Sequence, residues 1–460
     1  MSVKPNWTLP PFKLATGRRG AGAAFWRAAK AEKSPEPADR NVCSTSILHD
    51  PLLPRQEGSS AAATVALAEN TAPHISIGIL AWNEEDAIAA TLESLFRQSF
   101  FANLARRNLH SEIICVANGC SDRTASVAEK CFAARRPGHR SKAAFAGRVL
   151  DLPERGKSNA WNSFVHTHSA RSAQFLFLMD GDIVIHHPDT LWNMYLALLN
   201  HPEASVSVDQ PLKDLTFKPR KTLFDRVSLA TSRLTQTGTA QLTGQLYCIR
   251  TDVARKILLP RDLLVEDGFI KAMVCTDSLR RPTSAWRLVR AENASHIFQA
   301  YASTRDILKN QKRQMIGQTI THVLVDRYLA HLPDTVKTHL ARFVQEKEEA
   351  EPLWLKQLIG EHVRATRYFW ELFPGVLRFR FKRLARLGVA QWLRHVPATI
   401  AGFAVTLLAC RAAHRLLKNG YTDYWPDTKS TRLQELDVAS PEAGNGGFLA
   451  RETPALPASR

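Results

Sequence analysis

The sequence predicts an α/β domain built on a mostly parallel sheet. From residue 74 to residue 182, apolar runs of strand length alternate with segments that carry apolar residues at helical spacing. Each apolar run ends in a polar loop, as a buried parallel strand does. Ligands bind outside the carboxyl ends of such strands, so we expect these loops to meet at one edge of the sheet.

The elements follow one another in a regular order. HISIGILAWNEE is a strand and loop, and DAIAATLESLFRQ is a helix. SEIICVANGCSDRT and ASVAEKCFAARR repeat this plan, AGRVLDLPERGKSNAWN is the next strand and loop, and QFLFLMDGD is the following strand. Beyond residue 200 the pattern is mixed and predicts no clear order of elements.

Charge and cysteine content narrow the class of protein. The net charge of +18 over 460 residues indicates a polyanionic partner, an acidic membrane surface or a phosphorylated ligand. The seven cysteines are scattered and form no CxxC pair, which favours reduced thiols and argues against a zinc site.

Composition also divides the chain. Residues 1–73 are rich in Ala, Pro, Arg and Ser, which predicts a disordered extension, and no apolar signal segment follows the first charges. We therefore expect the catalytic part to stay in the cytoplasm. The predicted domain is 74–330, followed by a helical, basic region at 331–425 and a flexible tail at 426–460.

The basic region has the pattern of a membrane-associated segment. No acidic residue occurs between Glu371 and Asp423, and residues 396–410 are apolar. About 15 apolar residues are short of the ~20 that a spanning helix needs, so a re-entrant segment, a short span and a buried core helix all remain open. RNA binding is the alternative for this charge, but no nucleic-acid module accompanies it. Three apolar residues share one helical face, as in an interfacial helix: Leu377, Phe381 and Leu384.

Two carboxylates follow the strand FLFLM directly. Asp180 and Asp182 flank one glycine, and hard cations such as Mg²⁺ or Mn²⁺ bind to one or two carboxylates together with substrate phosphates. Taken alone, the DGD triplet is better explained as a turn, because Asp and Gly favour turns.

Six motifs together resemble family 2 glycosyltransferases, which are inverting enzymes with a GT-A fold. ILAWNEEDAIAATLESLFRQ, VANGCSDRTASVA, PERGKSNAWN, LMDGD, TGQLYCIRTD and LLVEDGFI match the family's motifs in order over residues 74–320. The family's QxxRW motif is altered, because LKNQKRQMIG retains only Arg313. The missing tryptophan favours transfer of a single sugar over processive synthesis.

The resemblance implies a role for each motif. Asp267 would be the catalytic base, and Asp182 with Asp180 would hold the Mg²⁺ or Mn²⁺ ion. The residues implied at the acceptor site are Gly244, Gln245 and Glu266. Those implied in binding the nucleotide-sugar are Ala81, Asn83, Glu84, Asn118, Asp122, Lys157, Asp180 and Arg313.

Several of these residues also have structural interpretations. Asp122 suits a cap before the next helix, Lys157 a solvated surface position, and Glu266 the first turn of a helix, where acids complement the helix dipole. His296 fits a packed histidine better than a late metal ligand.

The predicted function is metal-dependent, inverting transfer of a hexose from a nucleotide-sugar to a lipid-linked or polysaccharide acceptor. Such an enzyme would work at the cytoplasmic face of the inner membrane in surface glycan assembly. The alternatives are a metal-dependent nucleotidyltransferase and a non-catalytic membrane-associated scaffold. A glycoside hydrolase would use two carboxylates but would not account for Lys157.

Overall fold

The computed structural model describes residues 72–135, 145–222, 225–226, 229, 240–300, 304–373 and 389–420. The predicted N-terminal extension up to residue 71 and the predicted tail lie outside the described residues. So do the three residues of the predicted interfacial helix face, Leu377, Phe381 and Leu384.

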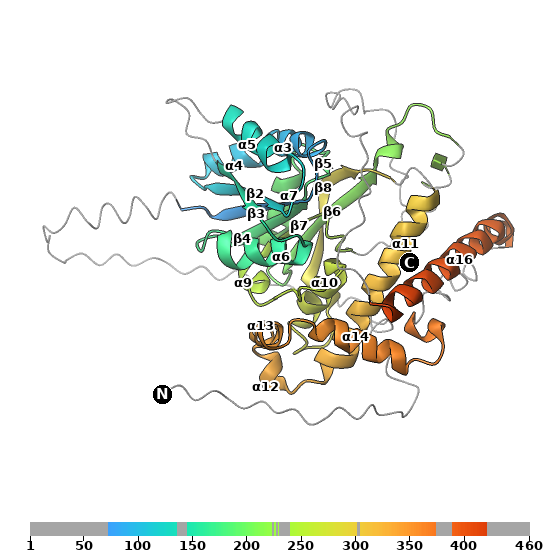
Figure 1. The fold of residues 1–460 in the computed structure, drawn as a ribbon. Helices are drawn as coiled ribbons and strands as arrows, with labels where there is room; N and C mark the ends of the chain where they lie inside the picture. Colours follow the sequence, from blue (N-terminus) through green and yellow to red (C-terminus); the bar gives the residue numbers. More distant parts are fainter. Residues whose placement is uncertain are drawn as a thin grey trace, which may run out of the picture.

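Among the described residues, eight strands form one sheet in the order β3-β2-β1-β4-β7-β6-β8-β5 (Figure 1). The first four strands in this order are parallel. Strand β7 is antiparallel to β4 and β6, β6 is parallel to β8, and β5 is antiparallel to β8. The α/β class and the parallel half are confirmed, but the whole sheet is mixed rather than mostly parallel. The strands are β1 (Ile75–Ala81), β2 (Ser111–Asn118), β3 (Phe145–Leu152), β4 (Phe175–Asp180), β5 (Val184–Ile185), β6 (Val206–Lys213), β7 (Leu246–Arg250) and β8 (Leu288–Phe298).

Helices cover both faces of the sheet, which explains the unbroken apolar runs. Every residue of β1 is buried: Ile75, Ile77 and Ile79 face one apolar cluster, and Leu80 faces the other. The helices on the first face are α3 (Ile88–Phe96), α4 (Ser99–Arg106), α5 (Thr124–Ala134) and α7 (Thr190–Asn200). Those on the second face are α6 (Lys157–Asn162), α9 (Thr251–Ala254) and α10 (Glu266–Thr276).

Close packing fixes α6, the helix that begins at Lys157. A Cβ atom added to Gly78 would lie 2.8 Å from the ring of Phe164, which follows α6. Glycine is therefore needed in β1 for this approach. The Trp161 indole Nε1–H donates to the Tyr247 hydroxyl at 2.7 Å, and both side chains are buried. These contacts hold the C-terminal part of α6 and the residues that follow it against β1 and β7.

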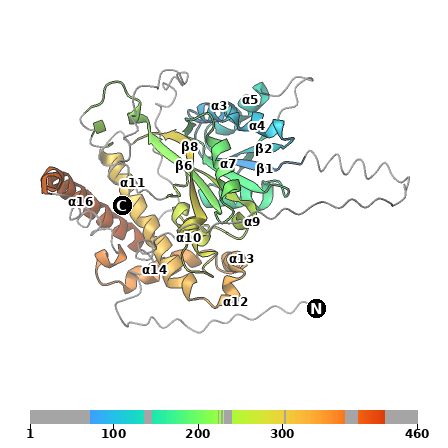
Figure 2. The same ribbon diagram turned by 180° about the vertical axis from the view of Figure 1, so that it is seen from behind.

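The C-terminal helices continue the same apolar core. One cluster of buried side chains includes Val206 of β6, Phe269 of α10, Ile320 of α11 and Ala413 of α16. The apolar core therefore runs without a break across the predicted boundary at residue 330. Figure 2 shows these helices from behind. They are α11 (Thr304–Thr321), α12 (Asp334–Lys337), α13 (Leu340–Ala350), α14 (Trp354–Ala365) and α16 (Val389–Lys418).

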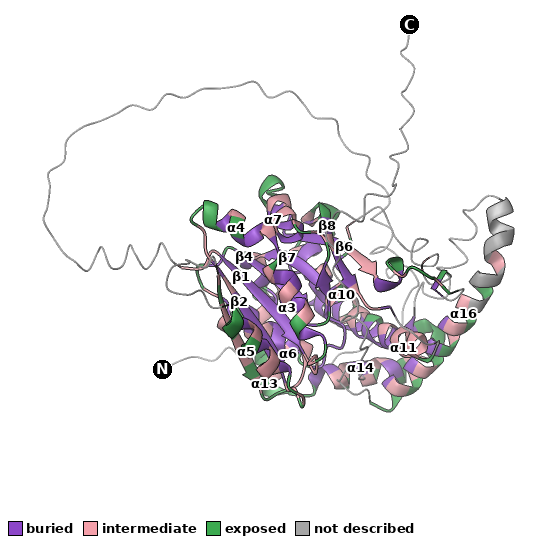
Figure 3. Cartoon of the chain, turned by 90° about the horizontal axis from the view of Figure 1, so that it is seen from above, coloured by how far each residue is buried: buried purple, intermediate pink, exposed green. Residues whose placement is uncertain are grey.

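The apolar stretch 396–410 lies within α16. Near its end, Ala409 and Cys410 are buried, whereas Ile400 and Leu408 are each 58% exposed. Figure 3 shows buried and exposed positions side by side along α16. This part of α16 therefore packs against the core on one side and exposes apolar residues on the other. Within the described part of the chain, no helix is both long enough and apolar enough to cross a bilayer.

Candidate functional site

The ends of β1, β2 and β4 bring the predicted site residues to one edge of the sheet. Leu80 pairs with Val116 of β2 on one side and with Asp180 of β4 on the other. The backbone N–H of Asp180 donates to the Gln245 carbonyl at 2.9 Å, which places the loop before β7 at the same edge. Sequence order alone predicts this convergence, because parallel strands end together.

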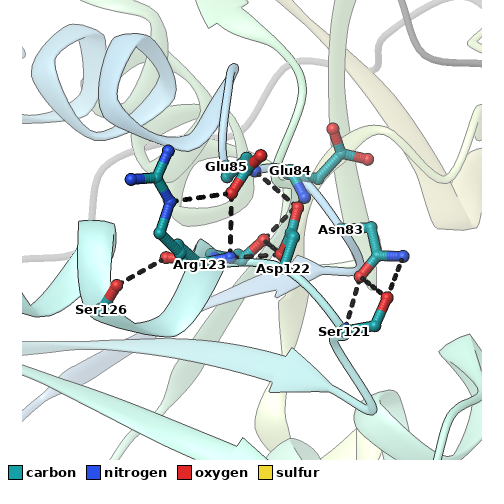
Figure 4. A network of polar contacts seen from close by, with 8 residues as sticks. Asn83, Glu84, Glu85, Ser121, Asp122, Arg123 and Ser126 are labelled. Atoms are coloured by element: carbon teal, nitrogen blue, oxygen red, sulfur yellow. Dashed lines mark hydrogen bonds and ion pairs between the residues drawn. The ribbon is translucent and has the colours of Figure 1, made fainter.

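The loops after β1 and β2 are joined by side-chain hydrogen bonds (Figure 4). Asn83 has a φ of 54°, a left-handed conformation that asparagine tolerates. Its Oδ1 accepts from the Ser121 N–H at 2.8 Å. The Glu85 N–H donates to Asp122 Oδ2 at 3.2 Å, and the Arg123 N–H donates to Glu85 Oε2 at 3.0 Å. Asn83 and Asp122 therefore fix the shape of this pair of loops.

Asp122 also forms a turn that leads into α5, which begins at Thr124. Its Oδ1 accepts from the Thr124 N–H at 3.0 Å and from the Thr124 hydroxyl. The hydroxyl oxygen in turn accepts from the Glu84 N–H at 2.7 Å. These contacts are those of a turn, and through Thr124 they also fix the backbone of Glu84.

Asn118 is buried, and both ends of its amide bind backbone. Its Nδ2 donates to the Ala81 carbonyl at 2.7 Å, and its Oδ1 accepts from the Gly156 N–H at 3.1 Å. A buried amide satisfied in this way holds its neighbours in place. Asn118 therefore sets the distance between β1 and the loop that precedes Lys157.

Lys157 joins two carboxylates from distant parts of the chain. Its Nζ lies 2.6 Å from Asp180 Oδ1 and 2.6 Å from Glu266 Oε1. Nζ also donates to the Gly244 carbonyl at 3.4 Å. Burial works against the ammonium charge, but the two carboxylates more than offset it and raise the pKa of Lys157. Lys157 is not the solvated surface residue that composition favours.

The two acids of DGD differ in environment. Burial raises the pKa of Asp180 to about 7 against the effect of Lys157. Asp182 is accessible to solvent, although the surrounding protein still raises its pKa. Because Asp180 is held by the ammonium, Asp182 is the carboxylate more open to a cation.

These residues fit a cation that also binds phosphate. The described residues contain no group of three or more His, Cys, Asp or Glu side chains placed to hold a metal. Mg²⁺ and Mn²⁺ sites in phosphate-binding enzymes commonly use only one or two carboxylates and take their other oxygens from substrate and water. Asp182, with Asp180 beside it, supplies that donor set.

Asp267 lies in the first turn of α10, beside Glu266. Burial, assisted by the nearby Glu266 charge, raises the pKa of Asp267 to about 6. Its Oδ1 accepts from the Gly268 N–H at 2.6 Å. The positive charges of Lys157 and Arg313 act on both Asp267 and Asp182. Arg313, which is buried in α11, therefore belongs to the same cluster.

The segment before β7 lies between the metal candidates and α10. Gly244 has a φ of 74°, and a Cβ atom there would lie 3.1 Å from Glu266 Oε1. The Gln245 Oε1 lies 3.3 Å from His296 Nε2, while His296 Nδ1 lies 2.7 Å from Asp209 Oδ2. Both ring nitrogens of the fully buried His296 thus have protein partners, which fits a packed histidine.

Sequence reasoning missed three pairs near this edge. The Arg155 guanidinium lies 3.5 Å from the centroid of the Trp82 ring, a cation–π contact between the first and third loops. The other two pairs are Trp161 with Tyr247 and Asp209 with His296. Each joins residues far apart in the chain, and no local pattern could have indicated them.

Comparison with known proteins agrees with the motif order. Residues 76–257 match the family model described as Glycosyl transferase family 2. No curated protein matches the chain. Among solved structures, the chain is similar to a mannosyltransferase from Pyrobaculum calidifontis in complex with GDP-Man and Mn²⁺, with 14% identity, a TM-score of 0.45, and coverage of 76% of this chain and 88% of that one.

Two further structures show weaker similarity. S. aureus TarS 1-349 in complex with UDP has 15% identity and a TM-score of 0.36, over 76% of this chain and 93% of that one. Glucosyl-3-phosphoglycerate synthase from Mycobacterium tuberculosis, in complex with Mn²⁺, UDP-glucose and phosphoglyceric acid, has 16% identity and a TM-score of 0.37, over 61% of this chain and 86% of that one.

Proposed function

We propose that this chain is a family 2 glycosyltransferase with a GT-A fold, which transfers a hexose from a nucleoside-diphosphate sugar to an acceptor hydroxyl. The observation that carries the proposal is the Lys157 ammonium, which lies 2.6 Å from Asp180 of DGD and 2.6 Å from Glu266, and so brings the DGD acids to the helix end that carries Asp267. The family match over residues 76–257 supports the same conclusion. The Arg313 guanidinium and the accessible carboxylate of Asp182 suit a diphosphate leaving group, and the carboxylate of Asp267, whose pKa is raised, suits a proton acceptor.

The reaction is a single displacement at the anomeric carbon. The acceptor oxygen forms a bond to this carbon, and the bond from the carbon to the diphosphate oxygen breaks. Asp267 takes the hydroxyl proton as the new bond forms, a contribution on the order of 10²–10⁴ in rate. One displacement with one base inverts the configuration.

A bound cation and Arg313 would balance the negative charge on the departing diphosphate. Asp182, with Asp180 beside it, would hold Mg²⁺ or Mn²⁺, which when bound stabilises the negative charge of the leaving group. Arg313 adds a guanidinium, which suits phosphate oxygens.

The acceptor is a lipid-linked sugar or a polysaccharide at the cytoplasmic face of a membrane. The charge of +18 and the exposed apolar residues Ile400 and Leu408 of α16 support a membrane surface as a partner. Transfer of one sugar at a time fits the absence of the family's tryptophan after Arg313.

A donor screen tests the proposal. The full chain is incubated with UDP-, GDP- and dTDP-sugars in Mn²⁺ or Mg²⁺, and release of nucleoside diphosphate is measured. We expect turnover of at least one donor and loss of that turnover in Asp267→Asn. Release of pyrophosphate from nucleoside triphosphates without turnover of any sugar donor would instead indicate a nucleotidyltransferase.

A further inference from the structure

The Lys157 ammonium is surrounded by protein acceptors, an arrangement that differs from that of a side chain that binds a diphosphate. Its ammonium is 2.6 Å from Asp180 at the end of β4 and 2.6 Å from Glu266 at the start of α10. A third acceptor, the Gly244 carbonyl, lies 3.4 Å away. An ammonium has three N–H donors, so these three acceptors match its hydrogen-bonding capacity.

The three charged side chains are largely withdrawn from water. Lys157 is 16% exposed, Asp180 is 17% exposed and Glu266 is 6% exposed. Removing one partner of a buried ion pair is strongly destabilising because it leaves the other charge uncompensated. If the ammonium moved to a substrate phosphate, Asp180 and Glu266 would both be left without the positive charge that now lies between them.

The contacts of Lys157 join three of the motifs. Asp180 belongs to DGD, Glu266 precedes the candidate base Asp267, and Gly244 lies in the loop that leads into β7. The side chain that joins these segments also fixes the distance between the cation ligands and the base.

We propose that Lys157 is a positioning residue that holds Asp180 to Glu266, and thereby sets the candidate base against the donor site, rather than a ligand of the diphosphate. This inference rests on the proposed function, because the donor site is defined by it. The ammonium also occupies one side of Asp180, which leaves cation binding mainly to Asp182.

Two variants separate positioning from ligand binding. Lys157→Arg keeps the positive charge, and a guanidinium binds phosphate well, so a ligand role predicts nearly normal affinity and turnover. A positioning role predicts that Lys157→Arg lowers kcat at least 10-fold, because the larger, planar guanidinium does not fit between the two carboxylates as the compact ammonium does. Lys157→Met is expected to lower kcat at least 100-fold. In both variants the Kd of UDP or GDP, measured by calorimetry with Mn²⁺, should change less than 3-fold.

A double-mutant cycle with Glu266→Gln tests the contact itself. Lys157→Met should lower the unfolding midpoint less in the Glu266→Gln background than in the wild type, because one of the unpaired carboxylates is gone. Lys256→Met, which removes an exposed lysine that pairs with Asp252 at 3.8 Å, is the matched control and should change neither kcat nor the midpoint.

The outcomes are distinct. Nearly normal kcat and nucleotide Kd in Lys157→Arg, together with a rise of 10-fold or more in nucleotide Kd in Lys157→Met, overturn the positioning role, and so do additive effects in the cycle. A wild-type chain that binds neither UDP nor GDP and turns over no donor overturns the proposed function. The cycle still decides on the Lys157–Glu266 contact in that case, because it needs no substrate.

Discussion

Gly244→Ala is expected to lower both the stability of the fold and the turnover, because the added methyl would press against two acidic side chains. The residue has a φ of 74°, which costs an L-residue about 1–2 kcal/mol. The new methyl would also lie 3.1 Å from Glu266 Oε1 and 3.3 Å from Asp267 Cβ, closer than ordinary contact. Lys157 holds Glu266, and the α10 backbone holds Asp267, so neither acid moves away freely.

The magnitudes follow from these contacts. Each kcal/mol lost lowers Tm by roughly 2–4 °C in a domain of about 150–250 residues, so the fall in this larger continuous core should lie at or below the lower end of that range. Because a misplacement of ~1 Å in a catalytic group can cost about 100-fold, a shift of a few tenths of an ångström in Asp267 should lower kcat by roughly 10-fold. Calorimetry and donor turnover measure the two effects.

Gly360→Ala in α14 is the matched control. Its Cβ would meet only the flexible end of Arg364 at 3.4 Å, and alanine favours a helix, so Tm should stay level or rise. Full stability and activity in Gly244→Ala would refute the argument that this glycine is required beside the two acids.

Three further predictions concern other contacts at the same edge. Tyr247→Phe removes the acceptor of the buried Trp161 Nε1–H, and should cost about 1–3 kcal/mol in a denaturant titration; an unchanged midpoint would contradict the bond. Asp122→Ala removes the acceptor of the Thr124 N–H and should cost about 1 kcal/mol and weaken UDP or GDP binding, whereas tighter binding would argue against the role of this loop. Burial raises the pKa of Asp267 to about 6, so the base is protonated below this pH; kcat should rise with pH through about 6 and then level off, and a flat profile from pH 5 to pH 7.5 would speak against Asp267 as the base.

The parallel half of the fold was predictable because each strand there is buried on both faces. The seven residues of β1 and five of the six in β4 are buried, so each appears in the sequence as an unbroken apolar run. Strands β6 and β8 have mixed burial and a bulge between Val208 and Gln210, and their sequences lack such runs. Their directions therefore depend on distant pairing that local pattern does not encode.

The candidate site, like the fold, could be predicted only in part. Strand order predicts that Asn118, Asp180 and Asp182 lie near one another, because parallel strands end at the same edge of the sheet, whereas Asp267 was added only by the family resemblance. The motifs do not reveal that Lys157 is paired with Asp180 and Glu266, since these contacts span 23 and 109 residues of sequence. Pairing across such separations depends on where the start of α10 lies relative to the end of β4, which only the structure shows.

Cation binding by Asp182 is the most direct test of the account. Mn²⁺ binding to the wild type and to Asp182→Asn should be compared by electron paramagnetic resonance in the presence of UDP or GDP, alongside donor turnover with and without EDTA. We expect the wild type to bind Mn²⁺ and to lose turnover in EDTA, and the variant to lose at least 100-fold in turnover together with Mn²⁺ affinity. Equal Mn²⁺ affinity in the two proteins, with turnover that persists in EDTA, would contradict the metal-assisted mechanism.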